Sequence, residues 1–257
     1  NRGGRQCFNW GYCGHLRWNM VHLRLENSGK CACFGLMTEF LFRMVRRFSF
    51  AWQMALRGVF RMADKYVAYV GSYTRGESDG IYILDANVEY AYFKVRDSFK
   101  INNPSFLRLS HDEQYLYSNC DEGVASFKIL PDGGLELMNK ASVNGLRPCY
   151  LSVDRANRYL LTAGYHDGKL TVLRLNEDGT IQGVTDEVFM KGLGSIAGRN
   201  YRCHVNCAIF SPDERFIMAV DLGMDQVKVY EFDHETGKIK LHDILRCELE
   251  SGPKHMI

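Results

Sequence analysis

The sequence has 257 residues, of which 46% are hydrophobic and 24% are charged. A chain of this composition can bury a sizeable core, either as one large domain or as two small ones. The formal net charge of +2 does not provide the strongly basic surface expected of a nucleic-acid-binding protein, so no nucleic-acid partner is predicted.

The first 61 residues differ from the rest in charge. They hold ten of the 32 Lys and Arg residues but two of the 30 acids, and therefore carry +8 while the remainder carries −6. All three Trp lie in this part and all five Pro lie after it. The sequence predicts a basic extension over 1–61, joined near Met62 to a domain over 62–257.

Three interpretations of the extension stay open. The apolar stretch 36–60 contains Arg43, Arg46, Arg47 and Arg57, and charges at that density disfavour a membrane-spanning helix. It also lacks the pattern of a secretory signal. An Arg-rich segment with few acids can resemble an organelle transit peptide or a membrane-surface helix. We favour a non-native or disordered extension, because the chain restarts at Met62 and a strand follows at once. No membrane partner is expected.

The nine cysteines are an odd number, which excludes a fully paired disulfide framework. Five lie in or beside strand-like runs of the second part, where free Cys behaves as a small apolar residue. We therefore expect a reducing, cytoplasmic compartment. A metal site drawn from Cys31, Cys33 and nearby Cys and His residues (Cys7, Cys13, His15, His22) fits no common zinc spacing. No metal and no cofactor are predicted.

From Tyr66 onward the hydrophobic period is two, which predicts strands over 66–70, 81–84 and 90–95. The later blocks repeat one order: strand, Asp-containing turn, strand, short polar loop, strand and turn. One full block predicts strands over 150–153, 159–163 and 170–175. Asp112, Asp154 and Asp213 are interpreted as turn residues that share one position of the block.

A recurring block sets the architecture. It starts near Pro104, Pro148, Val205 and Pro253, at spacings of 44, 57 and 48 positions. Short strands repeated every 40–50 residues or so are typical of β-propeller blades. We predict an all-β fold with about four blades. The long spacing reflects a glycine-rich insertion over 190–201, which we expect to be a surface loop because it does not match a phosphate-binding motif.

Several strings resemble one family in combination. The most specific run from Cys203-His204 through Ala208–Phe216 to Val220–Tyr230, with support from Tyr69–Thr74, Pro148–Asp154 and Gly252–His255. Over residues 64–257 the chain is similar to the lactonase family of seven-bladed β-propellers, whose superfamily includes fungal carboxymuconate cyclase. The resemblance implies that about three blades would follow Ile257.

Candidate site residues come from strand starts and from the resemblance. His204 begins an inner strand, and its imidazole can activate water near neutral pH; the resemblance implies that His204 and Lys254 are pocket residues. Arg147, Arg202 and Lys254 can supply positive charge. Asp221 either orients the base, binds a sugar hydroxyl or caps a turn, and His255 lies at the channel rim.

The resemblance implies hydrolysis of a sugar lactone, with 6-phosphogluconolactone of the pentose phosphate route as the expected substrate. A small phosphorylated lactone is then the partner. The alternatives are a non-catalytic propeller that binds a ligand or a partner, and a muconate-type lactonising enzyme. An acidic residue on the strand after His255 would favour either enzyme.

Overall fold

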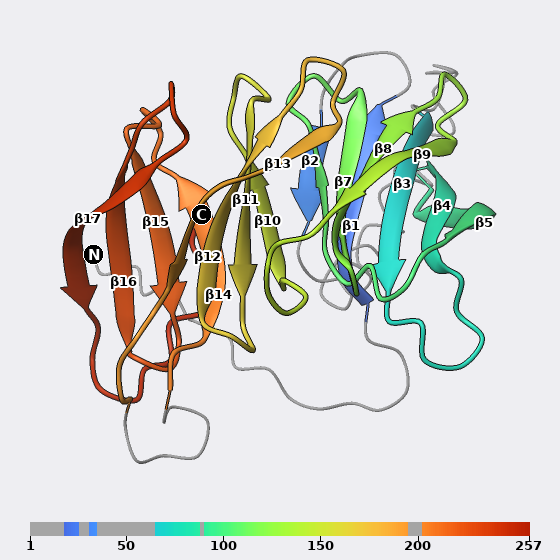
Figure 1. Cartoon of the computed structure of the whole chain (residues 1–257). Coiled ribbons are helices and arrows are strands. Elements are labelled where there is room, and N and C mark those ends of the chain that lie inside the picture. Colours follow the sequence, from blue (N-terminus) through green and yellow to red (C-terminus); the bar gives the residue numbers. More distant parts are fainter. Residues whose placement is uncertain (1–17, 26–30, 35–64, 88–89, 195–201) are drawn as a thin grey trace, which may run out of the picture.

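The computed structural model describes residues 18–25, 31–34, 65–87, 90–194 and 202–257. Within them the secondary structure is entirely β, arranged as four antiparallel sheets that stand side by side (Figure 1). The predicted all-β blade architecture is confirmed.

Three sheets have four strands each, in chain order. The second sheet contains β6 (Leu107–Leu109), β7 (Tyr115–Cys120), β8 (Gly123–Ile129) and β9 (Leu135–Ala141). The third contains β10 (Tyr150–Val153), β11 (Tyr159–Gly164), β12 (Lys169–Leu175) and β13 (Ile181–Phe189). The fourth contains β14 (Val205–Phe210), β15 (Phe216–Asp221), β16 (Gln226–Phe232) and β17 (Ile239–Arg246). The predicted strands of the recurring block lie where the sequence placed them.

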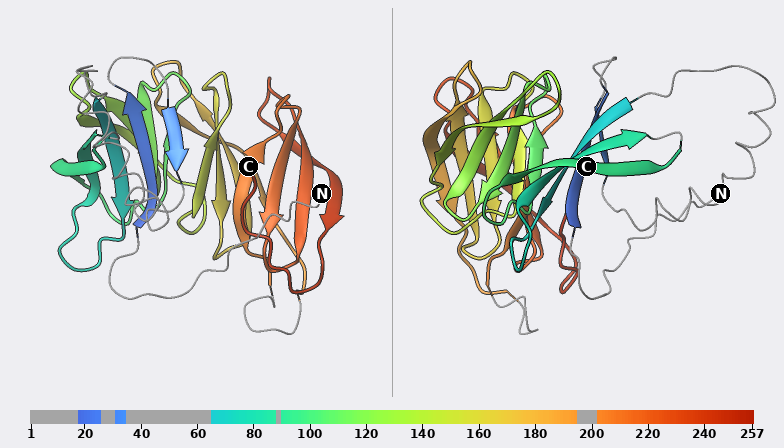
Figure 2. Two further views of the ribbon diagram at one scale, coloured as in Figure 1. Left: turned by 180° about the vertical axis from the view of Figure 1, so that it is seen from behind. Right: turned by 90° about the vertical axis from the view of Figure 1, so that its right-hand side faces the viewer.

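The first sheet is built differently. Its order is β2-β1-β3-β4-β5, from β1 (Trp18–Leu25), β2 (Cys31–Phe34), β3 (Lys65–Ser72), β4 (Gly80–Asn87) and β5 (Tyr92–Lys100). Figure 2 shows β1 beside β3 in a second view. β1 thus lies beside β3 in the same way that β6 lies beside β7, β10 beside β11 and β14 beside β15.

Part of the predicted extension therefore contributes strands, which its composition did not indicate. The domain boundary near Met62 stays a prediction. Other features read from the sequence lie outside the described residues: Cys7, Cys13 and His15 of the rejected metal set, the apolar stretch 36–60, and most of the glycine-rich insertion.

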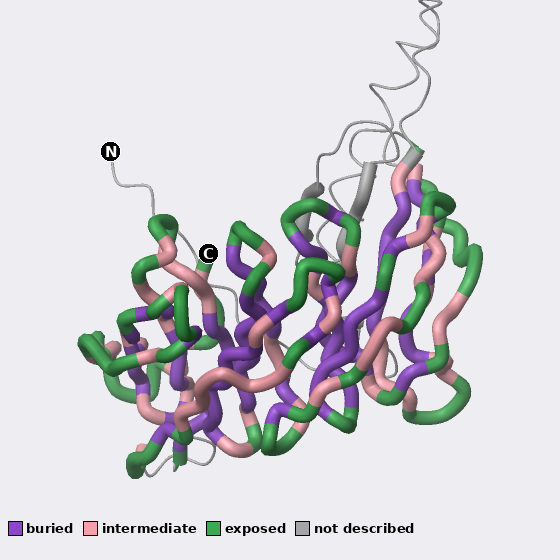
Figure 3. Tube along the Cα trace, turned by 45° about the horizontal axis from the view of Figure 1, so that its top comes forward, coloured by how far each residue is buried: buried purple, intermediate pink, exposed green. Residues whose placement is uncertain are grey.

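The core lies between neighbouring sheets. Both faces of the second and third sheets are covered, so their middle strands read as nearly continuous buried runs, and Figure 3 shows buried positions gathered there. Large side chains at the three interfaces have almost no exposed surface: Tyr69 and Phe127 between the first and second sheets, Tyr117 and Leu160 between the second and third, and Tyr159 and Ile217 between the third and fourth. The outermost strands β5 and β17 are largely exposed, and β9 and β13 are exposed or half-buried along most of their length.

Each outermost strand also carries a register shift against its neighbour. The shifts fall at Ile83/Leu84, Ser126/Phe127, Val172/Leu173 and Val229/Tyr230. These are equivalent places in the four sheets. A bulge at such a place bends the strand and increases its twist.

The turn between the first two strands of a block uses a side-chain cap. Asp154 Oδ1 accepts the backbone N–H of Tyr159, as the hydroxyls of Ser110 and Ser211 do at the equivalent turns. Asp112 and Asp213 instead lie two positions later, hydrogen-bonded to those serines. The turn role of the three aspartates is confirmed. The prediction that they share one position of the block is wrong, because Asp154 stands where the other two turns have Ser110 and Ser211.

Lys169, at the start of β12, is 2% exposed. Its ammonium donates to the carbonyl oxygens of Val143 and Asn144 and to Glu187 at 2.6–3.1 Å. We expect Lys169→Ala to lower the free energy of unfolding by about 3 kcal/mol, because it leaves those acceptors unpaired. Urea unfolding followed by circular dichroism measures the change, with the exposed Lys240→Ala as control. Equal losses for the two variants would contradict this account.

Candidate functional site

The loops at one end of the sheets form what we call the rim. In each sheet the inner strand begins there, the second strand ends there, and the loop to the next sheet returns there. The described rim segments are 73–79, 101–106, 121–122, 142–149, 165–168, 190–194, 202–204, 222–225 and 247–257. All six candidate residues from the sequence lie on this rim or at a strand end that meets it.

His204 directly precedes the inner strand β14. Its Nδ1 lies 2.7 Å from the carbonyl oxygen of Tyr165, and its ring stacks on the Tyr165 ring with centroids 4.2 Å apart. Because a carbonyl oxygen accepts, Nδ1 carries the proton and Nε2 of the neutral ring keeps its lone pair. The residue is 3% exposed, so the imidazole is held in one tautomer and one orientation.

Asp221 ends β15 and has no exposed surface. Its Oδ1 accepts backbone N–H groups of His204 at 2.9 Å, Gly223 at 3.2 Å and Met224 at 3.3 Å. Its Oδ2 lies 3.7 Å from the ammonium of Lys228, which is also nearly buried. The carboxylate therefore holds two backbone segments together, the one at His204 and the loop at Gly223 and Met224. This favours the capping role over direct contact with a substrate.

Gly223 allows the segment before His204 to approach closely. A Cβ at this position would overlap the carbonyl oxygen of Arg202 and touch the His204 ring. Arg202 itself is exposed beside this contact. The backbone of the Asp221 loop and the Arg202–His204 segment are thus packed directly on each other, and the exposed Arg202 lies two positions before His204 in the chain.

Lys254 and His255 are exposed on the segment that follows β17. The His255 ring lies 6.2 Å from that of Tyr150. Partial desolvation of this ring, together with the charge of Lys254, lowers the pKa of His255, which favours the neutral imidazole.

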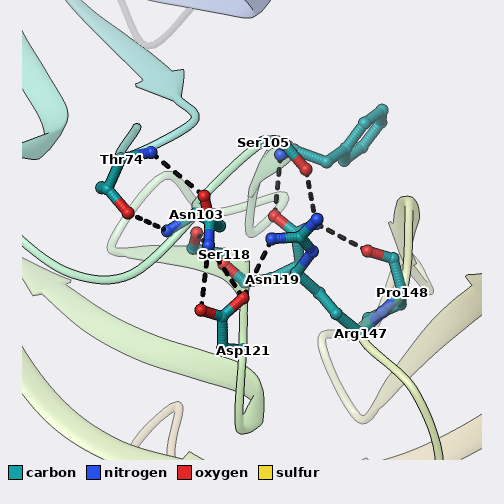
Figure 4. A network of polar contacts seen from close by, with 9 residues as sticks. Thr74, Asn103, Ser105, Ser118, Asn119, Asp121, Arg147 and Pro148 are labelled. Atoms are coloured by element: carbon teal, nitrogen blue, oxygen red, sulfur yellow. Dashed lines mark hydrogen bonds and ion pairs between the residues drawn. The ribbon is translucent and has the colours of Figure 1, made fainter. Parts of the chain in front are cut away.

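Arg147 lies in the loop before β10. Its Nη1 donates to Asp121 Oδ1 at 2.9 Å (Figure 4). Its Cζ lies 5.2 Å from the centroid of the Tyr73 ring. Two residues later, the Cys149 thiol donates to the carbonyl oxygen of Val205, next to His204. The loop that carries Arg147 thus contacts the start of β14 through Cys149.

The structure brings His204, Asp221 and Arg202 into one packed group, with Arg147 in a second group on the same rim. The sequence missed Asp121, Tyr165 and Asn103. They lie in short polar loops with no motif, and the repeat alone gave no signal for them.

The five thiols whose side chains are described are free, and each is buried or half-buried. Burial raises the pKa of Cys120 and of Cys203 to about 11 and that of Cys149 to about 12. Among the described residues, no group of three or more His, Cys, Asp and Glu side chains is placed to hold a metal ion.

In the same residues no helix is long and apolar enough to cross a bilayer.

A cavity of about 490 Å³ lies at the other end of the sheets, lined by turn residues that include Asp112, Arg158, Glu177 and His234. None of the six candidate residues lines it. The candidate site is therefore the rim and not this cavity.

Comparison with known proteins identifies the family of the chain. The family model for "Lactonase, 7-bladed beta-propeller" matches residues 67–257. A 6-phosphogluconolactonase of Bacillus subtilis is 33% identical over 198 residues, which cover 75% of this chain and 56% of the relative. A 6-phosphogluconolactonase of Formosa agariphila is 26% identical, covering 74% and 57%.

Solved structures agree. The periplasmic gluconolactonase of Pseudomonas aeruginosa superposes with a TM-score of 0.68 at 27% identity, covering 75% of this chain and 58% of that one. The chain spans a little over half the length of the relatives it matches. The matched region holds all four described sheets from β3 onward, so the resemblance read from the sequence is confirmed and the chain belongs to the lactonase family of seven-bladed β-propellers.

Proposed function

We propose that the protein hydrolyses the lactone ring of 6-phosphogluconolactone to the open-chain acid. The support is membership of the lactonase family and the names of two relatives. The observation that carries the chemistry is the bond from His204 Nδ1 to the Tyr165 carbonyl oxygen. It leaves Nε2 as the acceptor that a general base requires.

In this proposal Nε2 takes a proton from water as the water oxygen bonds to the lactone carbonyl carbon. The carbonyl oxygen becomes an oxyanion, and a nearby cation, Arg202 or Lys254, stabilises it. The tetrahedral intermediate collapses, the ring C–O bond breaks, and the proton on the imidazolium passes to the departing ring oxygen. His204 is 3% exposed, so the imidazole is largely screened from bulk solvent.

The substrate phosphate is bound by positive charge on the same rim. Arg147 and Arg202 lie in connections between sheets, and Lys254 lies in the segment that follows the fourth sheet. Guanidinium and ammonium groups form charge-assisted hydrogen bonds with phosphate oxygens. A substrate that spans from Arg147 to His204 would follow the loop that joins them.

The test compares two lactones that differ in the phosphate. We expect the full-length protein to hydrolyse 6-phosphogluconolactone with kcat/KM at least about tenfold above that for glucono-1,5-lactone, since a charged hydrogen bond contributes about 1.5–3 kcal/mol. Rates are measured by pH-stat above the spontaneous background. Rates at background for both lactones would overturn the proposal and leave a binding scaffold.

We also propose a cytoplasmic location. The support is the set of five free, buried or half-buried thiols in the described sheets, which persist in a reducing compartment. Cell fractionation with an antibody against the protein tests this, and recovery in an oxidising compartment would contradict it.

A further inference from the structure

We infer that Asp121 is a positioning residue that holds the Arg147 guanidinium over Tyr73 to bind the substrate phosphate. The inference rests on the proposed function, because it assigns the phosphate-binding group of the same rim. It gives a role to an acidic side chain that lacks any sequence motif.

The Arg147 guanidinium is fixed from two directions. Asp121 Oδ1 accepts from Nη1 at 2.9 Å, and the Tyr73 ring lies against Cζ at 5.2 Å. The Arg147 side chain is 22% exposed. A guanidinium carries five N–H donors, and the bond to Asp121 uses one of them. A preorganised guanidinium loses less conformational entropy when an anion binds.

Asp121 is itself held in place (Figure 4). Both of its carboxylate oxygens accept from Asn103 Nδ2, at 2.9 and 3.0 Å. Asn103 is locked to Thr74 by a reciprocal pair of bonds: the Thr74 N–H donates to Asn103 Oδ1, and the Asn103 N–H donates to the Thr74 hydroxyl. The orientation of the carboxylate is therefore set by the connection from the first sheet to the second, which holds Asn103, and by the loop between β3 and β4, which holds Thr74.

The backbone beside Arg147 is also anchored. Asn119 has no exposed surface, and its amide donates to the carbonyl oxygen of Pro148 at 2.6 Å and to the Ser105 hydroxyl at 2.9 Å. Its Oδ1 accepts the N–H of Phe106. The backbone at Arg147 is thus positioned through Pro148, and its guanidinium is positioned through Asp121.

A second cation shares the Tyr73 ring. The Cζ of Arg75, an exposed residue, lies 5.9 Å from the ring centroid. Two guanidinium groups on one tyrosine provide the charge for a phosphate, and Asp121 neutralises part of it. A merely neighbouring acid would repel the phosphate, so its removal would tighten binding. A positioning acid has the opposite effect, and this difference in sign makes the inference testable.

The experiment is calorimetric titration of the full-length protein with 6-phosphogluconate, and with gluconate as the matched ligand without phosphate. We expect Asp121→Ala and Arg147→Ala each to weaken binding of 6-phosphogluconate by about tenfold or more, as for a lost charge-assisted hydrogen bond. Binding of gluconate should not change. Asp121→Asn, which keeps an acceptor oxygen, should recover part of the affinity.

Glu122 and Arg155 provide the controls. Glu122 is the next acid of the same turn but pairs with Lys140, and Arg155 is exposed at the opposite end of the sheets. We expect both alanine variants to bind 6-phosphogluconate as the unmodified protein does. Thermal unfolding confirms that each variant is folded. If Asp121→Ala is not folded, the direction of the change in 6-phosphogluconate affinity of Asp121→Asn tests the inference: weaker binding supports it and tighter binding contradicts it.

Tighter binding by either Asp121 variant, or an equal loss with gluconate, overturns the inference, as does absence of 6-phosphogluconate binding by the unmodified protein. Because the titration needs no turnover, a protein that binds through Arg147 but hydrolyses no lactone would overturn the proposed function alone.

Discussion

His204→Ala is expected to lower kcat for lactone hydrolysis by about 10²–10⁴-fold, the usual contribution of a positioned general base. The bond from Nδ1 to the Tyr165 carbonyl fixes the tautomer, and the stacked ring fixes the orientation. Alanine removes both the proton acceptor and its alignment. KM should change little, because the phosphate-binding cations stay in place. The measurement is initial rate against substrate concentration, with the spontaneous rate subtracted.

His242→Ala is the matched control for that experiment. His242 is exposed on the outermost strand β17, where its Nδ1 lies 3.0 Å from Glu231, and we expect its variant to keep the unmodified rate. Near-ultraviolet circular dichroism checks that the His204 variant retains its packing. Equal kcat values for His204→Ala and the unmodified protein would remove His204 from the mechanism.

Asp221→Ala is expected to lower the free energy of unfolding by about 3–5 kcal/mol, the range found when one partner of a buried ion pair is removed. The variant leaves three backbone N–H groups without their acceptor and Lys228 without its counter-charge. Asp221→Asn retains an acceptor oxygen but no charge, so its loss should be smaller. Urea unfolding followed by far-ultraviolet circular dichroism gives both values.

Glu136→Ala, at an exposed position of β9, should shift the same measurement by less than about 0.5 kcal/mol. If Asp221→Ala unfolds at the same urea concentration as Glu136→Ala, the carboxylate does not hold the loop. A stable Asp221→Ala protein with weakened substrate binding would instead support the sugar-hydroxyl interpretation.

The sequence predicted the sheets because their signals are local. Alternating apolar residues and an Asp- or Gly-containing turn specify each hairpin without information from elsewhere in the chain. The pairing of β1 with β3 was not predictable in this way. It joins Trp18 to Ser72 across the charge break, and neither composition nor period reveals which distant segment completes a sheet.

The site was predictable only where a residue stands in a recognisable string. His204 and Arg147 lie at strand starts that the repeat identifies. Asn119 and Asp221 perform the same task, each accepting the N–H of the residue before an inner strand. The register of β14 shifts between Val205 and Cys207. Asn119 and Asp221 therefore stand at different positions of the repeat, and an alignment of the repeat copies does not match one with the other.

The repeated bulge of the outermost strands has a consequence for solubility. Within the described residues, β5, β9, β13 and β17 each pair with one strand only, so each leaves a row of backbone donors and acceptors that could pair with another chain. The bulges at equivalent places break each row into two short, twisted halves. Charged side chains follow along the same strands, including Arg96, Glu136, Lys240 and Arg246. Both features disfavour edge-to-edge pairing between copies of a chain built by repetition.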